Sequence, residues 1–470
     1  MSDQKRLSRR QFLATAGSGL AASAILAACG NAASTGGATA VPAEAPAATA
    51  ATAAPAAATS APAAPAATAP AAAAAGGAVL LARPDIKGAY AMEAAVAAWN
   101  AEFPTKLTLD ESSDGVDTKI QAAQAADDLI WSGYSIIAMP WETQTYVKRS
   151  IIQPLDSYIA ASTVPDADKV LAAIIPTVRD SSQYDGKQYG IPGNVGSVAL
   201  AWQTQIFKDV GIAEQPQTWE ELYEAAKKIK AAKPDLMPFD VAASPLCDLY
   251  AMIWGAQDDP YNSDGLIDIA GPAAVEALGW LQKMVEEELM PPVHADSFGN
   301  WLKGGTAMIL SFDVAGTLYE QTFGPGTATT GTTIFKTKGE AKAGVPFWMN
   351  ASVLLDKAKS PQVITDFYLW WFGPNNKANG KQIATVAAKP AYEYTYEEFI
   401  KPDPAQAWQI VGIDLIRVSK GFSLTTPNGT EQTITGPYIE QVIDPAQRAD
   451  PKESMESALA DIKAELAAQG

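Results

Sequence analysis

The segment from Asn31 to Gly77 limits what this 470-residue chain can fold into, because it is built almost only of Ala, Pro, Thr, Ser and Gly. Glu44 is its only charged side chain. Such a composition offers too little apolar surface to offset the entropy lost on ordering, so we expect a disordered, partly polyproline-like tether over residues 29–77. The remaining 393 residues, Ala78–Gly470, exceed what one hydrophobic core usually holds. We therefore expect the folded part to consist of two lobes.

The first 29 residues carry two processing signals. Ser8-Arg9-Arg10-Gln11-Phe12-Leu13 is typical of a twin-arginine export signal, and Leu26-Ala27-Ala28-Cys29 is typical of a lipobox. The apolar stretch between them is shorter than the about 20 residues that a membrane-spanning helix needs. We therefore expect residues 1–28 to be a signal peptide that is removed. Cys29 would then be lipidated and would hold the protein on the outer face of the cell membrane.

Charge and residue usage exclude several classes of function. The chain has 52 acidic and 34 basic side chains, so its formal net charge of −18 makes nucleic acid an unsuitable partner. His294 is the only histidine, and with Cys29 lipidated Cys247 is the only free thiol. Nucleophilic sites that use an imidazole, and most zinc sites, cannot be assembled from so few of these residues. We expect no disulfide, no metal and no cofactor, whereas chemistry that uses a pair of carboxylates remains open.

Short β-rich runs alternate with helical stretches at the start of the folded part. We expect strands at 78–83, 106–111 and 135–139, with helices at 90–103 and 117–126 between them. This alternation favours an α/β fold with a largely parallel sheet covered by helices. Ligands bind at the carboxyl ends of the strands in such sheets, which places residues 83–85, 111–113 and 140–142 at one rim.

Three later helices are predicted from their start signals and apolar stripes. Thr218-Trp219-Glu220-Glu221 is typical of a capping box, and Ser360-Pro361 places a proline at the first helical position. The third helix covers residues 454–466 and has apolar side chains at helical spacing. We expect all three stripes to pack in the core.

Several segments together resemble a known family. Asp185-Gly186-Lys187-Gln188-Tyr189-Gly190-Ile191-Pro192 is followed by Trp202–Ile212, Pro216–Leu222, Trp301–Met308 and Ser454–Leu466. Their order resembles the extracellular solute-binding proteins of ABC importers, the group that includes maltose-binding protein. Two departures stand out: Trp202-Gln203 replaces the common Tyr-Asn, and Phe312-Asp313-Val314 replaces Gly-x-Trp. The second change removes a sugar-stacking tryptophan, which argues against a maltose-like ligand.

The resemblance implies a bilobed, periplasmic-binding-protein-like α/β fold of type II, with two parallel-rich sheets, flanking helices and a hinge. It implies that residues 78–192 and 295–344 form lobe 1, and that residues 193–294 and 345–470 form lobe 2. The lobes would close on a ligand, and the closed, monomeric protein would dock on the membrane subunits of an ABC permease.

Sugars present a ring face that packs on aromatic side chains and hydroxyl groups that bind polar ones. Of the twelve tryptophans, Trp141 follows a strand at the predicted rim, and Trp348 lies with Asn350 in an expected short apolar loop, residues 345–352, at the last lobe crossing. We expect these three residues to face the ligand. The hydroxyl-binding candidates are Glu142, Asn194, Asp248 and Asp313. The tryptophans at 99, 219, 280, 370 and 371 lie in expected helices, where core packing is favoured, and core packing is also favoured for Trp202 and Trp408.

These features favour a lipid-anchored receptor that delivers a mono- or oligosaccharide to an ABC importer and is not an enzyme. A receptor for a polyamine, a peptide or a metal complex is an alternative within the same fold. A secreted glycan-cleaving enzyme that uses paired carboxylates is an alternative of another class. Incubation with oligosaccharides separates the last from the others, because only an enzyme forms products.

Overall fold

The computed structural model describes residues 77–84, 87, 90–112, 116–138, 140–242, 246–292, 296–338, 343–385, 389–421 and 428–469. The predicted export signal, Cys29, the tether up to residue 76 and His294 lie outside these residues. Within them, no helix has both the length and the apolar character needed to span a bilayer.

The first half of the molecule is a sheet with the order β2-β1-β3-β10-β6. Its strands β1, β2 and β3 are parallel, whereas β10 is inserted antiparallel between β3 and β6. The predicted strands and helices at the start of the folded part are confirmed to within two residues at each end. The elements of this half are β1 (Ala78–Ala82), α4 (Met92–Glu102), β2 (Leu107–Glu111), α5 (Val116–Ala125), β3 (Gly133–Ala138), α6 (Pro140–Lys148), α7 (Asp156–Ala160), α8 (Ala167–Ala172), α9 (Pro176–Asp180), β10 (Phe347–Leu354), α16 (Pro361–Phe372), α17 (Lys377–Thr385), β11 (Lys389–Pro390), α18 (Glu393–Thr395) and α19 (Ile413–Val418).

The second half contains β7, β8 and β9, which join the same sheet through β6. β8 pairs antiparallel with β6 and parallel with β7. The elements of this half are α10 (Thr204–Val210), α11 (Trp219–Ala232), β7 (Met237–Val241), a π-helical turn (Leu246–Tyr250), α12 (Ala251–Trp254), α13 (Pro272–Glu286), α14 (Ser297–Leu302), β8 (Thr306–Phe312), α15 (Ala315–Phe323), β9 (Ala328–Thr330), α20 (Asn428–Ile443) and α21 (Pro451–Gln469).

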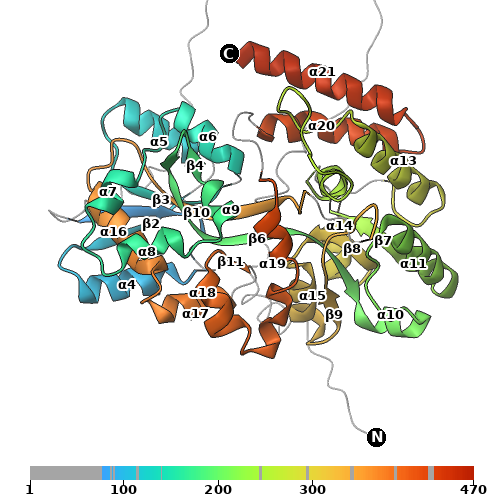
Figure 1. Cartoon of the computed structure of the whole chain (residues 1–470), viewed down its shortest axis with the longest axis horizontal. Coiled ribbons are helices and arrows are strands. Elements are labelled where there is room, and N and C mark those ends of the chain that lie inside the picture. Colours follow the sequence, from blue (N-terminus) through green and yellow to red (C-terminus); the bar gives the residue numbers. More distant parts are fainter. Residues whose placement is uncertain are drawn as a thin grey trace, which may run out of the picture.

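The long strand β6 (Gly190–Gln203) connects the two halves (Figure 1). It follows a small hairpin, β4 (Gln183–Tyr184) and β5 (Lys187–Gln188), whose turn residues Asp185 and Gly186 both have positive φ, as a tight hairpin turn requires. β6 pairs with β10 as far as Ser197 and with β8 from Val198 onward. The change of partner after Ser197 marks the boundary between the halves. We call the region around Ser197 and Val198, with their partners Phe347 and Phe312, the junction.

In both halves, strands end at the junction. In the first half Phe347, the first residue of β10, lies opposite Ser197, and the carboxyl end of β3 lies beside β10 at Met349. In the second half Phe312, the last residue of β8, lies opposite Val198, and the parallel β7 ends on the same side. The carboxyl ends of β3, β7 and β8 therefore meet at the junction, where ligands bind in open α/β sheets.

The pairings differ from the division of the lobes expected from the sequence. Residues 295–344 are expected in lobe 1, but β8 pairs with β7 in the second half. Residues 345–470 are expected in lobe 2, but β10 pairs with β3, and α16 packs against α7 and α8 in the first half. The last part, α20 and α21, packs against α13 in the second half, and α20 also contacts α6 of the first half. The expected division fails for residues 345–354 because the antiparallel insertion of β10 between β3 and β6 is a long-range pairing that has no local sequence signal.

The predicted helix starts and buried stripes are confirmed. The Thr218 side chain accepts a hydrogen bond from the Glu221 amide, and the Glu221 carboxylate reaches back to the amide of Gln217. Proline opens α16 at its first position, and the predicted stripes of α11, α16 and α21 contribute to the core. Three of the five tryptophans expected in the core are buried (Trp99, Trp219 and Trp371), whereas Trp280 and Trp370 are half-buried against it.

Candidate functional site

The structure places all seven predicted ligand residues on elements that border the junction. Trp141 and Glu142 begin α6 directly after β3, and Asp248 lies in the π-helical turn that follows β7. Asp313 comes directly after β8. Asn194 lies on β6. Trp348 and Asn350 do not lie in a loop as expected, because residues 347–354 form the strand β10 between β3 and β6.

Asn194 and Asn350 are register partners on β6 and β10, and their side chains are joined. The Asn350 Nδ2 group donates to Asn194 Oδ1 over 2.7 Å. The Asn350 Oδ1 atom and the nearby Tyr90 hydroxyl are both buried, and neither has a hydrogen-bond partner among the described residues. Buried polar atoms without partners are costly, so these two atoms are suited to accept or donate a bond to a polar ligand or a water molecule.

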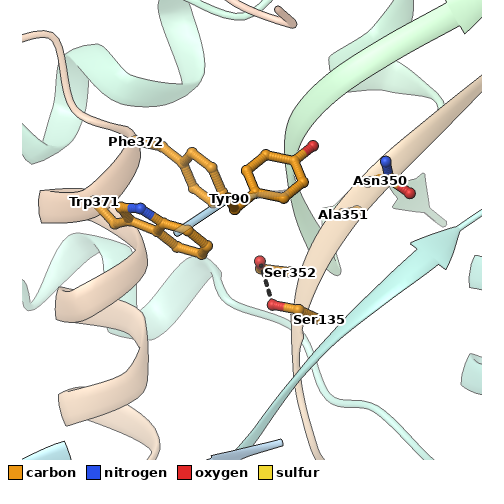
Figure 2. Close-up of a pocket in the computed structure, with 7 residues that line it drawn as sticks. All are labelled: Tyr90, Ser135, Asn350, Ala351, Ser352, Trp371 and Phe372. Atoms are coloured by element: carbon orange, nitrogen blue, oxygen red, sulfur yellow. Dashed lines mark hydrogen bonds between the residues drawn. The ribbon is translucent and has the colours of Figure 1, made fainter. Parts of the chain in front are cut away.

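A small cavity lies beneath Asn350 (Figure 2). The Tyr90 hydroxyl points toward Asn350, and the ring of Tyr90 lies beside those of Trp371 and Phe372. Burial raises the pKa of Tyr90 well above its usual value, and the Asn350 side chain opposes this only in part. The cavity has a volume of about 10 Å³, which is enough for roughly one water molecule. It is therefore too small to be a sugar pocket.

Trp348 links the two halves by packing. Its ring meets Phe312 of β8 edge to face, with centroids 4.7 Å apart at 87°. It also covers Gly196 of β6, where an added Cβ would come within 2.1 Å of the Trp348 ring. Only 8% of Trp348 is exposed, so most of its surface contacts protein in this structure.

Asp313 forms an ion pair with Lys389 of β11. Both side chains are fully buried, at 0% and 1% exposure. The same carboxylate oxygen, Oδ2, accepts from the backbone amide of Ser197 over 3.2 Å, whereas Oδ1 is buried without a partner among the described residues. Lys389 lies 5.3 Å from the ring centroid of Trp408, which adds a cation–π contact.

A second polar group lies at the carboxyl ends of β1 and β2 in the first half, around Tyr134. Burial raises the pKa of the Tyr134 hydroxyl, and the charge of Asp117 raises it further. The other polar neighbours that act on this hydroxyl are Arg83, Ser112 and Glu142. Tyr146 of α6 donates to Asp117 over 2.9 Å. The structure thus brings together charged and polar groups from the loops after three neighbouring strands, near the predicted rim.

Asp248 borders a third polar group, in the second half. Its Oδ1 atom accepts from the amide of Leu249 over 2.6 Å, and the charges of Asp248 and Glu431 both act on the buried Tyr250 hydroxyl. Burial raises the pKa of Glu431 of α20 to about 7, against a hydrogen bond from the Ile267 amide that lowers it. Asp248 thus has polar neighbours within the second half.

Four of the seven predicted residues take part in contacts at the junction. Asn194 bonds to Asn350, and both Trp348 and Asp313 contact residues of the other half. The side chain of Trp141 lies outside the described residues. Trp202 stacks on Phe207, in agreement with the expected core role.

Two residues of the site, Lys389 and Tyr90, were not predicted from the sequence. A single cation in the apolar run Ala387-Ala388-Lys389-Pro390-Ala391 is a signal for a buried charge, since burial of a lysine requires a partner. Tyr90 carries no such signal. The described residues contain no group of three or more side chains suited to hold a metal ion.

The sequence is matched over residues 83–394 by a family profile described as bacterial extracellular solute-binding protein. The chain belongs to this family. Its members are binding proteins that work outside the cytoplasm, which agrees with the resemblance noted in the sequence.

Sequence relatives of this solute-binding protein share part of its length. A binding protein of Brucella abortus is 29% identical over 178 residues, which are 37% of this chain and 40% of the relative. An arabinooligosaccharide-binding protein of Halalkalibacterium halodurans is 21% identical over 237 residues, which are 47% of this chain and 50% of the relative. The matched region thus spans at most about half the length of these curated relatives.

Solved structures share the fold over nearly their whole length. The sugar-binding protein MalE of Xanthomonas citri has a TM-score of 0.70 at 17% identity, covering 84% of this chain and 98% of that one. A substrate-binding protein of Listeria monocytogenes in complex with cycloalternan has a TM-score of 0.67 at 17% identity, covering 83% and 99%. The predicted bilobed α/β fold of type II is therefore confirmed.

Proposed function

We propose that this solute-binding protein captures a carbohydrate at the junction and delivers it to an ABC importer. The observation that carries the proposal is the set of buried polar atoms without partners that border the crossing strands: Tyr90 Oη, Asn350 Oδ1 and Asp313 Oδ1. Tyr90 and Asn350 belong to the first half and Asp313 to the second, and Trp348 lies two residues from Asn350 on β10 and packs on Phe312, the residue before Asp313. Donors and acceptors beside an aromatic face suit a ligand with hydroxyl groups and an apolar ring face.

The known ligands of similar proteins support a carbohydrate. Two sequence relatives are arabinooligosaccharide-binding proteins, and structures of the same fold hold cycloalternan, maltose, D-mannitol or ribitol. These ligands differ in length and ring content but share many hydroxyl groups. The shared chemistry of the ligands supports a neutral polyhydroxyl compound.

We infer that binding closes the two halves about β6. Trp348 and Asp313 both contact residues across the boundary, so the closed arrangement has contacts that an open one would lose. A ligand held by both halves would favour the closed state, which a permease can distinguish from the open state.

We also propose that the mature chain is a monomer held on the membrane by lipid at Cys29, after export through the twin-arginine route. The tether of residues 29–77 would let the folded part stand off from the membrane and return to the permease. Its average end-to-end length as a flexible chain would be about 40 Å.

The proposal is tested by calorimetric titration of the mature protein with maltotriose, arabinotriose, mannitol and spermidine. We expect saturable binding of at least one of the three carbohydrates at one site per chain. Binding of spermidine alone would favour the polyamine alternative. Release of shorter sugars during incubation would favour the glycan-cleaving alternative, and binding of none of the carbohydrates would contradict the proposal.

A further inference from the structure

The carboxylate of Asp313 is held at one oxygen and left without a partner at the other. Oδ2 contacts the ammonium group of Lys389 and accepts from the Ser197 amide, whereas Oδ1 is buried and makes no hydrogen bond in the described part of the chain. A carboxylate oxygen accepts hydrogen bonds and cannot donate them. Oδ1 is therefore suited to bind a donor such as a ligand hydroxyl.

The holding contacts come from both halves. Lys389 lies on β11, which pairs with Asn194 and Val195 in the part of β6 that belongs to the first half. Asp313 follows β8 of the second half, and its own amide donates to the Ser197 carbonyl over 3.0 Å. The pair thus fixes the Asp313 carboxylate at the boundary between the halves, where the proposed ligand would lie.

We propose that Asp313 and Lys389 form a specificity element that accepts a hydroxyl group of the ligand and rejects an anionic ligand. This inference rests on the proposed carbohydrate function. Lys389 pairs with Asp313 through Oδ2, so its charge is already compensated and the site offers an acceptor at Oδ1. A ligand carboxylate beside Oδ1 would meet an oxygen that cannot donate to it and that carries like charge.

A purely structural ion pair is the competing interpretation. Removing one member of a buried pair leaves an uncompensated charge and destabilises the fold, whereas replacing both members with apolar side chains is often tolerated. The double variant Asp313→Leu/Lys389→Met therefore separates the two roles. We expect it to keep the fold under both interpretations while it removes the acceptor.

The test uses calorimetric titration of the mature protein with maltotriose, arabinotriose and mannitol, each beside an analogue whose terminal CH₂OH is oxidised to a carboxylate. We expect the wild type to bind a neutral member at least about 100-fold more tightly than its acid analogue. We expect Asp313→Asn to reduce this preference, because it removes the negative charge and frees Lys389. The double variant should melt close to the wild type yet bind the neutral ligand about 10- to 100-fold more weakly.

The control is Lys303→Met, which breaks the exposed pair between Lys303 and Asp296 and should leave affinity unchanged. Equal affinity of the double variant and the wild type for the neutral ligand would show that the pair is structural. Equal affinity of the wild type for neutral and acid members would likewise overturn the inference, while the carbohydrate function stands. Binding of no carbohydrate by the wild type would overturn the proposed function and the inference with it.

Discussion

At the scale of single residues, Trp348 has a proposed role in ligand binding and a role in packing, and a single substitution removes both. It is placed to contact a ligand at the junction, and it packs on Phe312 and Gly196. We expect Trp348→Ala to weaken binding about 30-fold or more, as truncation of an aromatic hot spot does. We also expect it to lower the free energy of unfolding of the empty protein by about 3 kcal/mol or more, because the side chain is buried.

Two comparison variants separate these effects, in calorimetric titrations and unliganded melting curves. Trp141→Ala should weaken binding to a similar degree with little loss of stability. Trp219→Ala removes a buried residue of α11 that packs on Trp280 of α13, so it should lower stability and leave affinity intact. Normal binding by both Trp141→Ala and Trp348→Ala would show that these tryptophans are structural.

Glu431 makes stability depend on pH. Its folded-state pKa is about 7, above its ordinary value of 4.5, because it is buried. Between these two values the folded state holds the proton and the unfolded state does not, so stability falls as pH rises and the contribution is lost above about pH 7. We expect the wild type to lose roughly 3 kcal/mol between pH 4.5 and pH 8 relative to Glu431→Gln.

Urea unfolding at pH 4.5 and pH 8 measures this difference. Glu440→Gln serves as the matched control, because Glu440 is exposed on the same helix, α20. An identical pH dependence for the wild type and Glu431→Gln would contradict the predicted titration.

At the scale of the elements, the crossing strand β6 depends on the absence of a side chain at residue 196. A Cβ there would come within 2.1 Å of the Trp348 ring, so the strand and β10 would have to separate. We expect Gly196→Ala to lower the free energy of unfolding by about 1–3 kcal/mol and to weaken ligand binding.

The matched control for thermal unfolding is Gly279→Ala in α13, where an added Cβ meets nothing within 4 Å. Alanine favours a helix over glycine by about 1 kcal/mol, so this variant should be as stable as the wild type or more stable. A Gly196→Ala protein as stable as Gly279→Ala would refute the close contact.

The sequence predicts these elements better than it predicts their grouping. The start of α11 at Thr218 and that of α16 at Pro361 follow from local chemistry, and the first strands follow from alternating patterns. The placement of β10 between β3 and β6 depends on pairing across more than 150 residues, which no local pattern encodes.

The same limit applies to the site. Asn194 lies beside the expected lobe boundary at residue 193, and Asp313 lies in the segment that departs from the family pattern; the structure places both beside the junction. Lys389 could not be paired with Asp313 from the sequence, since the two residues are 76 positions apart. Tyr90 reaches the junction only through the packing of its ring in the first half.

At the scale of the whole molecule, the lipid anchor predicts where the protein is found. Cys29→Ala removes the thiol that would be acylated, while the folded part from Ala78 onward is unchanged. We expect this variant to move from the detergent-soluble membrane fraction to an uncleaved or soluble form. Membrane partitioning equal to that of the wild type would exclude lipidation at this residue.

The central claim, that the two halves close on a carbohydrate, is tested most directly by a distance across the junction. Spin labels at Lys148 of α6 and Glu440 of α20 report on opposite halves, and both positions are exposed, whereas the native Cys247 is buried. We expect a broad or longer distance distribution in the empty mature protein and a single shorter distance with a saturating sugar from the titration panel. An identical distribution with and without a sugar that calorimetry shows to be bound would contradict closure.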